Sequence, residues 1–432
     1  MKDGNKKEYG FLTLMSAVIG TVIGSGIFFK SEEILNMTDG GVLWGLVVFL
    51  VGGAIMMLCA ASFATLSAEG GDEGGLVGYA EKMCGAGFAR FAALFSADFY
   101  LPSMTATLAY VSGDYFCRSV GAENSGVLHA TVSGAFLVLF FAANTLTPRA
   151  AGKFQIVSTA LKLLPLLAVG AVGCVSMIKG GVALLDPTPI GGGFVSALLS
   201  SAFAYEGWIA VTALGGEVKN AKRNMPLALT VGSAVVLSVY VFYYFGVVGA
   251  SGSGSSVSAF TNVFGERGGR AMLFFVTLSC LGALNGLTMS VVRGHYILSG
   301  RLLIGERRDR LFGEISAVTG IPVSSGIMGL LVSEAWLIVR FFSPSIGAEG
   351  LYFDPAEASI SVMYAIYVPI LLMMTVRLKI KSRVKRYILP VSAAIAASFV
   401  ALAAPIAFGW AMVLFVLAVA AVTLIVLSIY RR

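Results

Sequence analysis

Long apolar runs and short polar stretches alternate along the whole chain. A run of about 20 mostly apolar residues is long enough to cross a bilayer as a helix. We place such runs at 11–38, 42–68, 88–117, 127–147, 154–178, 194–214, 227–250, 270–299, 322–342, 357–377, 387–406 and 409–430. The polar stretches between them are too short for a separate water-soluble domain. The pattern therefore predicts one all-α polytopic membrane domain over residues 1–432.

Composition strengthens this prediction and narrows the function. Hydrophobic residues make up 57% of the chain and charged residues 12%, against about 25% charged in soluble domains. The two histidines and five cysteines form no cluster and no CxxC pair, so we expect no metal and no cofactor. No G-x-S-x-G or HExxH motif is present, so we do not expect an enzyme.

Positive charges lie mainly in alternate connections. The N-terminus, 69–87, 148–153, 215–226, 300–318, 378–386 and the C-terminus carry most of the lysine and arginine. The positive-inside rule then predicts a multi-pass protein of the plasma (inner) membrane with both termini in the cytoplasm. The net charge of +7 is then explained by orientation in the lipid bilayer. We therefore expect no nucleic acid partner. Oligomeric state is not readable from the sequence.

Two predicted spans are interrupted near their middle. The first contains Gly24, Ser25 and Gly26, and the sixth contains Glu206 and Gly207. Glycine costs a helix about 1 kcal/mol relative to alanine, and unpaired backbone is tolerated in a bilayer only where it lines protein or a cavity. The interruptions lie five spans apart, so the two segments cross in opposite directions. This predicts a 5+5 inverted-repeat transporter with discontinuous helices 1 and 6: repeat 1 over 10–180, repeat 2 over 192–378, and two extra helices over 387–430.

The interrupted helices predict the chemistry of a ligand. The outer half of the first span begins near Gly26, and its free N–H groups suit a carboxylate. The inner half leaves free carbonyl groups at Val22 and Ile23, which suit an ammonium group together with carbonyl groups of the sixth span. The simplest ligand with both groups is an α-amino acid. The candidate substrate site comprises Val22, Ile23, Gly24, Ser25, Gly26, Ile27, Phe203, Ala204, Tyr205 and Glu206.

Several motifs occur in the order known for one transporter family. These are Gly20-x-x-x-Gly24-Ser25-Gly26-Ile27-Phe28, 68–79, Gln155-x-x-x-Thr159-x-x-Lys162, 203–208, 217–226, and Gly282-x-x-Asn285-Gly286 with Arg293. Together they resemble the amino acid–polyamine–organocation (APC) superfamily, with motifs closest to the L-type amino acid transporter branch. The resemblance covers about residues 10–300; the remainder agrees only in hydropathy.

The resemblance implies a secondary active permease or exchanger that works by alternating access on neutral L-amino acids. In it, Ser25, Gly26 and Ile27 meet the substrate carboxylate, and carbonyl groups of Val22, Ile23, Phe203, Ala204 and Glu206 meet the amino group. Phe203 takes the place of an aromatic residue that closes over the substrate. Lys162 stands where sodium-coupled relatives hold Na⁺, which implies sodium-independent transport driven by protons or by exchange.

Other ionisable and polar residues lie inside predicted spans. Lys162 lies ~13 Å from the cytoplasmic end of its span, so it needs a partner or a neutral form, and we assign it a coupling or gating role over a purely structural one. The side chain of Glu206 stabilises the unwound segment or titrates during transport. Asp98 pairs inside the bundle or faces an aqueous path. Asn285 lines the path or joins helices, and Lys30 reaches the interface or faces the outer vestibule.

Two other functions remain as alternatives. A cationic amino acid or polyamine antiporter would favour an acidic pocket, and Glu206 is the residue that suggests one. A receptor or channel that does not turn over substrate belongs to a different class, and counterflow transport distinguishes it from a carrier.

Overall fold

The structure is a computed structural model, and it describes residues 9–24, 26–69, 75–122, 125–178, 193–251, 255–302, 312, 314–347 and 353–430. Apart from one bridge between Tyr9 and Val218, regular structure in these ranges is helical. The helices are α1 Phe11–Val22, α2 Gly26–Met37, α3 Val42–Ala68, α4 Leu76–Cys84, α5 Ala86–Phe95, α6 Leu101–Ser119, α7 Gly126–Leu146, α8 Pro148–Ile178, α9 Phe194–Ala204, α10 Ala221–Ser251, α11 Ser256–Leu302, α13 Val323–Gly347, α14 Pro355–Arg377, α15 Leu389–Phe408 and α16 Trp410–Tyr430. Two π-helical segments, η1 Ser96–Tyr100 and η3 Val384–Ile388, and a 3₁₀ segment, η2 Trp208–Glu217, complete the set.

Ten helices in the described ranges are long and apolar enough to cross a membrane. The predicted span 88–117 is built from α5, η1 and α6, and the last predicted span corresponds to α16, whose apolar part is Trp410–Val426. The connection 69–87, which we expected to be a loop, contains α4. The all-helical membrane fold class is thus confirmed, and the main correction is this additional helix.

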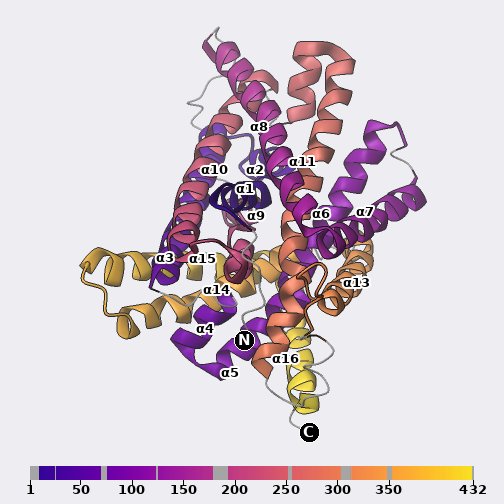
Figure 1. The fold of residues 1–432 in the computed structure, drawn as a ribbon. Helices are drawn as coiled ribbons and strands as arrows, with labels where there is room; N and C mark the ends of the chain where they lie inside the picture. Colours follow the sequence, from indigo (N-terminus) through magenta and orange to yellow (C-terminus); the bar gives the residue numbers. More distant parts are fainter. Residues whose placement is uncertain are drawn as a thin grey trace.

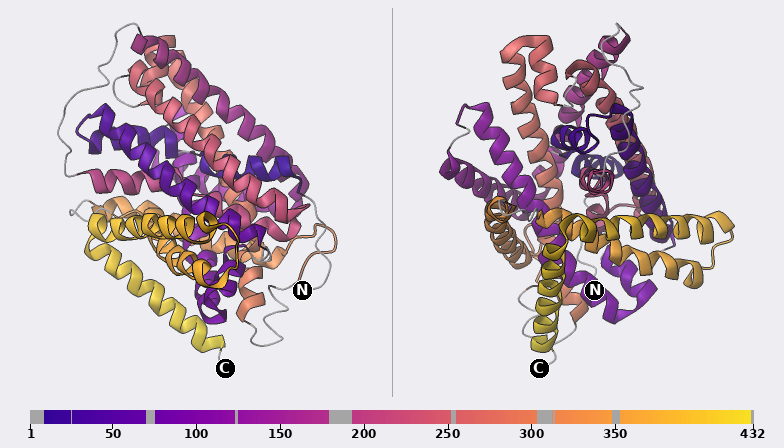
Figure 2. Two further views of the ribbon diagram at one scale, coloured as in Figure 1. Left: turned by 90° about the vertical axis from the view of Figure 1, so that its left-hand side faces the viewer. Right: turned by 180° about the vertical axis from the view of Figure 1, so that it is seen from behind.

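The interrupted helices lie in the centre of the molecule. Figures 1 and 2 show α1, α2 and α9 surrounded by longer helices. The helix α1 contacts α8, α10 and α11, while α9 contacts α3, α14 and α15. The most apolar 18-residue stretch is 76% buried in Phe11–Phe28 and 83% buried in Phe194–Glu217, against 22% in Gly126–Leu146. Segments that cannot pair their whole backbone within one helix are therefore the ones that other helices cover.

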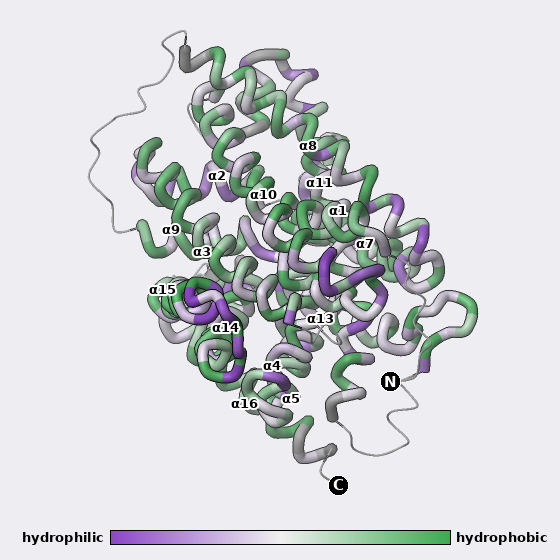
Figure 3. The backbone as a smooth tube through the Cα atoms, turned by 60° about the vertical axis from the view of Figure 1, so that its left-hand side comes forward, coloured by the Kyte–Doolittle hydropathy of each residue, from purple (hydrophilic) through white to green (hydrophobic). Residues whose placement is uncertain are grey.

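The periphery has the opposite character. Hydrophobic residues continue along the helices, and hydrophilic residues gather in connections such as that between α14 and α15 (Figure 3). The helices α7, α13 and α16 carry many exposed large apolar side chains, among them Leu139, Leu331 and Leu417. Exposed apolar surface on this scale is expected where lipid replaces water as the surrounding solvent.

Candidate functional site

The two interruptions are in direct contact. A Cβ atom on Gly26 would lie 2.8 Å from the Cα of Ala204, and one on Gly207 would lie 3.2 Å from the carbonyl oxygen of Thr21. Gly207 also has φ of 106°, a conformation that glycine adopts without strain. The structure therefore brings the segment Val22–Ile27 into contact with the segment Phe203–Gly207. Ser25 lies outside the described residues.

The break in the first span leaves donors on one side and acceptors on the other. The helix α1 ends at Val22, and Ile23 departs from helical geometry with ψ of 85°. The helix α2 begins at Gly26, so the N–H groups of Gly26 and Ile27 have no acceptor within their own helix. Donors at a helix start next to carbonyl groups at a helix end form a site for a ligand with both an anionic and a cationic group.

Lys162 caps the carbonyl end of α1. Its ammonium group donates to the carbonyl oxygens of Gly20 and Ile23, each at 2.6 Å, and approaches that of Ser279 at 3.4 Å. The side chain comes from α8, and the residue is 1% exposed. A cation at the negative end of a helix dipole is favourable. The family resemblance implied that this lysine bridges its helix to the inner half of the broken helix.

Tyr240 on α10 was not among our candidates. Its hydroxyl group lies 2.8 Å from the carbonyl oxygen of Val22 and 2.9 Å from that of Ala204, so it joins the ends of α1 and α9. These carbonyl groups were expected to hold a substrate ammonium group, and each still has a second lone pair. The sequence offered no signal for this contact, because Tyr240 lies in an ordinary apolar run.

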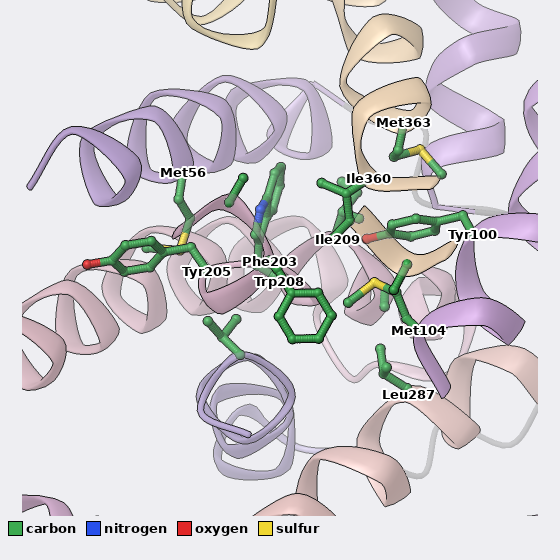
Figure 4. Packing of buried hydrophobic residues seen from close by; sticks show 14 of the residues in the cluster. Met56, Tyr100, Met104, Phe203, Tyr205, Trp208, Ile209, Leu287, Ile360 and Met363 are labelled. Carbon is green, nitrogen blue, oxygen red and sulfur yellow. The ribbon is translucent and has the colours of Figure 1, made fainter. Parts of the chain in front are cut away.

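The side chain of Glu206 is buried in a group of aromatic residues. The hydroxyl group of Tyr100, at the end of η1, donates to its carboxylate, and Tyr364 and Tyr367 on α14 interact with it electrostatically. Figure 4 shows Tyr100 directed toward the side of the core that holds Phe203 and Trp208, whereas Tyr205 points away from it. The ring of Tyr205 packs against Tyr240, so its side chain lies apart from that of Glu206.

Asp98 and Asn285 bind side chains outside the two breaks. Asp98 is in η1, where its carboxylate pairs with His295 at 2.9 Å, so it pairs inside the bundle. Asn285 donates to the side chain of Gln155 at 2.7 Å and accepts from Asn144 at 3.0 Å. Since these partners belong to α8 and α7, Asn285 joins three helices.

Lys30 differs from our expectation. We expected it to reach the interface or to face the outer vestibule, but the residue is 3% exposed and bound to Glu33 and Glu357. A second buried ion pair, between Arg293 and Glu217, lies beside Tyr9. Because the Lys30–Glu357 and Arg293–Glu217 pairs each join residues far apart in sequence, only the folded chain reveals them. Within the described ranges, no group of three or more His, Cys, Asp and Glu residues is placed to hold a metal ion.

Comparisons with known proteins show the family of this chain. The family model described as "Amino acid permease" matches residues 9–430. The chain is 29% identical to the serine/threonine exchanger SteT of Bacillus subtilis over 308 residues, 69% of each chain. It is 26% identical to the human b(0,+)-type amino acid transporter 1, over 85% of this chain and 80% of that one.

A solved structure also shares the fold. The structure of MhsT in complex with L-phenylalanine superposes with a TM-score of 0.64 at 15% identity, over 91% of this chain and 98% of that one. This likeness concerns the fold.

Proposed function

We infer that this chain, which belongs to the amino acid permease family, is a secondary active transporter that moves neutral L-amino acids across a membrane by alternating access. The observation that carries the proposal is the contact between two interrupted helices, with Gly26 against Ala204 and Gly207 against Thr21. Paired interruptions of this kind mark the substrate site of many transporters. The chain acts as a carrier and not as an enzyme.

The substrate spans the break in the first helix. Its carboxylate accepts hydrogen bonds from the N–H groups of Gly26 and Ile27 at the start of α2, and, as the motif resemblance implies, from Ser25. Its amino group donates to carbonyl groups at the ends of α1 and α9, chiefly those of Val22 and Ala204, for which it competes with Tyr240. Phe203 closes over the substrate, and carbonyl groups of Ile23, Phe203 and Glu206 complete the polar surface.

Lys162 supplies a positive charge beside the break and makes transport independent of sodium. Its two 2.6 Å hydrogen bonds to carbonyl groups of α1 are the contacts that a bound cation would otherwise make. Uptake into proteoliposomes should be the same in sodium and in choline buffers. A collapse of uptake in choline would disprove this role.

Exchange of one amino acid for another drives the transport. The proposal rests on the similarity to a serine/threonine exchanger; coupling to protons through Glu206 is the competing mechanism. Liposomes preloaded with amino acid should take up label much faster than empty ones, with or without a pH gradient. Uptake into empty liposomes that follows the pH gradient would indicate proton coupling instead.

We further propose that the protein lies in the plasma (inner) membrane with both termini in the cytoplasm. The repeats over 10–180 and 192–378 then run in opposite directions, each opening on an interrupted helix, and 387–430 follows them. The basic connection 378–386 would lie in the cytoplasm. Labelling of single cysteines introduced there and at 252–254, from either side of the membrane, tests the orientation.

The substrate class is tested with the purified protein. A screen of the twenty common amino acids by thermal shift should show stabilisation by small neutral ones, because a ligand at 100 times its Kd adds about 2.7 kcal/mol to the free energy of unfolding. Stabilisation by arginine or putrescine alone would favour the antiporter alternative. Internal ligand that fails to accelerate entry of label would favour a receptor or channel.

A further inference from the structure

The third span contains a π-helical turn, η1, shortly before Pro102. In an α-helix the carbonyl group of Asp98 would accept from the N–H group of residue 102, and a proline has none. The indole N–H group of Trp336 on α13 donates to this carbonyl oxygen instead, at 2.7 Å. The turn is thus tied to α13 through the carbonyl group that the proline leaves free. Short π-helical turns inside α-helices are frequent at functional sites.

The same turn makes side-chain contacts in two directions. The carboxylate of Asp98 accepts a hydrogen bond from Nε2 of His295 on α11 at 2.9 Å. The hydroxyl group of Tyr100 donates to the carboxylate of Glu206, in the break of the sixth span. Residues two apart on a helix point in nearly opposite directions. The turn therefore lies between α11 and the break, and makes a polar contact with each.

The ring of His295 is held by Asp98 and by packing. The residue is 5% exposed, and its ring lies 5.8 Å from that of Phe312, centre to centre. Its other ring nitrogen, Nδ1, is buried and makes no hydrogen bond within the described structure. The preceding residue, Gly294, packs closely on the turn, since an added Cβ would lie 3.4 Å from the Cβ of Ala97. Among the described residues, Asp98 is thus the polar partner that orients the ring.

Packing alone does not fix the place of Tyr100. A cavity of about 40 Å³ lies between η1, η2 and α11, and Ser96, Tyr100, Ile209 and Gly294 are among the residues that line it. This is more than the space of a single water molecule, about 10–15 Å³, so the turn has room to shift on this side. The hydroxyl group of Ser96 is buried and has no partner within the described residues. The hydrogen bonds to α11 and α13 are therefore what holds the turn in place.

We propose that Asp98 and His295 are positioning residues of the transport cycle: their hydrogen bond holds the π-helical turn where Tyr100 reaches Glu206. They act through the turn and not on the substrate. Without this bond the turn shifts toward the cavity, and a smaller share of the molecules forms the Tyr100–Glu206 bond. The proposal rests on the function inferred above and deepens it, because it names residues that set the rate of transport.

The first test is exchange in proteoliposomes, with the maximal rate and the half-saturating substrate concentration measured separately. His295→Ala removes the donor to Asp98, and the maximal rate should fall about tenfold. The half-saturating concentration should stay nearly unchanged, because the break in the first span is not altered. His295→Gln retains an N–H donor at a similar distance from the backbone and should restore most of the rate.

The other histidine of the chain, His129, supplies the matched control. Its Nε2 also makes a hydrogen bond between helices, from α7 to the carbonyl oxygen of Tyr110 on α6, at 2.8 Å. His129→Ala therefore removes a contact of the same kind without changing η1. Its maximal rate should remain close to that of the parent.

The second test asks whether His295 acts through Tyr100. In a Tyr100→Phe background, His295→Ala should lower the maximal rate little further, since changes within one network are coupled. The melting temperatures of the parent, the two single variants and the double variant give a second measurement that needs no transport. The decrease in the double variant should be smaller than the sum of the two single decreases.

The proposal is wrong if His295→Gln is as slow as His295→Ala, because the hydrogen bond would then not be what matters. It is also wrong if the two losses of rate multiply and the two decreases in melting temperature add. An equal loss of rate in His129→Ala would show a general effect of removing a histidine between helices and would overturn it as well. A parent that exchanges no amino acid would instead contradict the proposed function, and the melting temperatures would still decide whether His295 acts through Tyr100.

Discussion

The break between α1 and α2 and the break between α9 and η2 lie against each other, yet the first receives a charged side chain from a neighbouring helix and the second carries one of its own. The first break has no ionisable side chain of its own, and its carbonyl groups receive the ammonium group of Lys162 and the hydroxyl group of Tyr240. The second break carries an acid, Glu206, which accepts from Tyr100. The side chain of a buried lysine therefore contacts one half of the site, and a buried acid bound to a phenol lies in the other.

This difference indicates that the two breaks have different functions in the transport cycle. The ammonium group of Lys162 is bound to backbone carbonyl groups, whose places are fixed by the helices that carry them. A carboxylate bound to a tyrosine can gain or lose a proton as its surroundings change. The first break is therefore suited to hold the substrate backbone, and the second is suited to respond to the state of the transport cycle.

The largest effect is expected from the cation of the first break. Lys162→Met leaves the carbonyl groups of Gly20 and Ile23 without their donor, and hydrogen bonds to charged groups contribute about 1.5–3 kcal/mol each. Exchange in proteoliposomes should fall about 100-fold at equal protein content. Lys153→Met, on an exposed part of the same helix, is the control and should retain exchange. Equal loss in both variants would contradict a specific role for Lys162.

A somewhat smaller effect is expected where the two breaks touch. Gly26→Ala places a methyl group 2.8 Å from the Cα of Ala204, and such overpacking costs about 1–3 kcal/mol. The melting temperature and the substrate affinity should both decrease. Gly87→Ala is the matched control, because nothing lies within 4 Å of its added Cβ. If Gly26→Ala binds substrate as tightly as the parent, the contact does not shape the site.

The acid of the second break is tested through its donor. Tyr100→Phe removes the hydroxyl group that donates to Glu206, and a buried acceptor without a donor costs about 1–3 kcal/mol. Melting temperature and exchange rate should decrease, and a combined Tyr100→Phe and Glu206→Gln variant should recover part of the stability. Tyr205→Phe is the control, because its hydroxyl group makes no hydrogen bond within the described structure. No recovery in the double variant would argue against the pairing.

The smallest effect is expected from the hydroxyl group that the breaks share. Tyr240→Phe removes the hydroxyl group that lies between the carbonyl oxygens of Val22 and Ala204. Its single proton can donate one hydrogen bond, which contributes about 0.5–1.5 kcal/mol to the free energy of unfolding. Because the substrate amino group competes for these carbonyl groups, affinity measured by isothermal titration calorimetry should stay the same or improve. A large loss of affinity would mean that Tyr240 supports the substrate directly.

Sequence reasoning succeeded where chemistry is local. The apolar runs, the glycine-rich break at Gly24–Gly26 and the second break at Glu206–Gly207 can be read from neighbouring residues, since each concerns the periodicity or the backbone of one helix. For Asn285 it left two alternatives open, and for Lys30 it was wrong, because the surroundings of both residues come from other helices. Asn285 joins three helices, and Lys30 is paired and buried.

The sequence by itself determined that the chain is a bundle of membrane helices with two interrupted ones, because bilayer thickness and the needs of unpaired backbone act on contiguous residues. Only the tertiary structure decided which side chains serve those interruptions. The rotation of α10 directs Tyr240 to both helix ends, η1 places Tyr100 at Glu206, and the packing of α14 brings Glu357 to Lys30. A helix can turn about its axis without changing its hydropathy much when it is apolar all round, so contacts between helices set the direction of these groups.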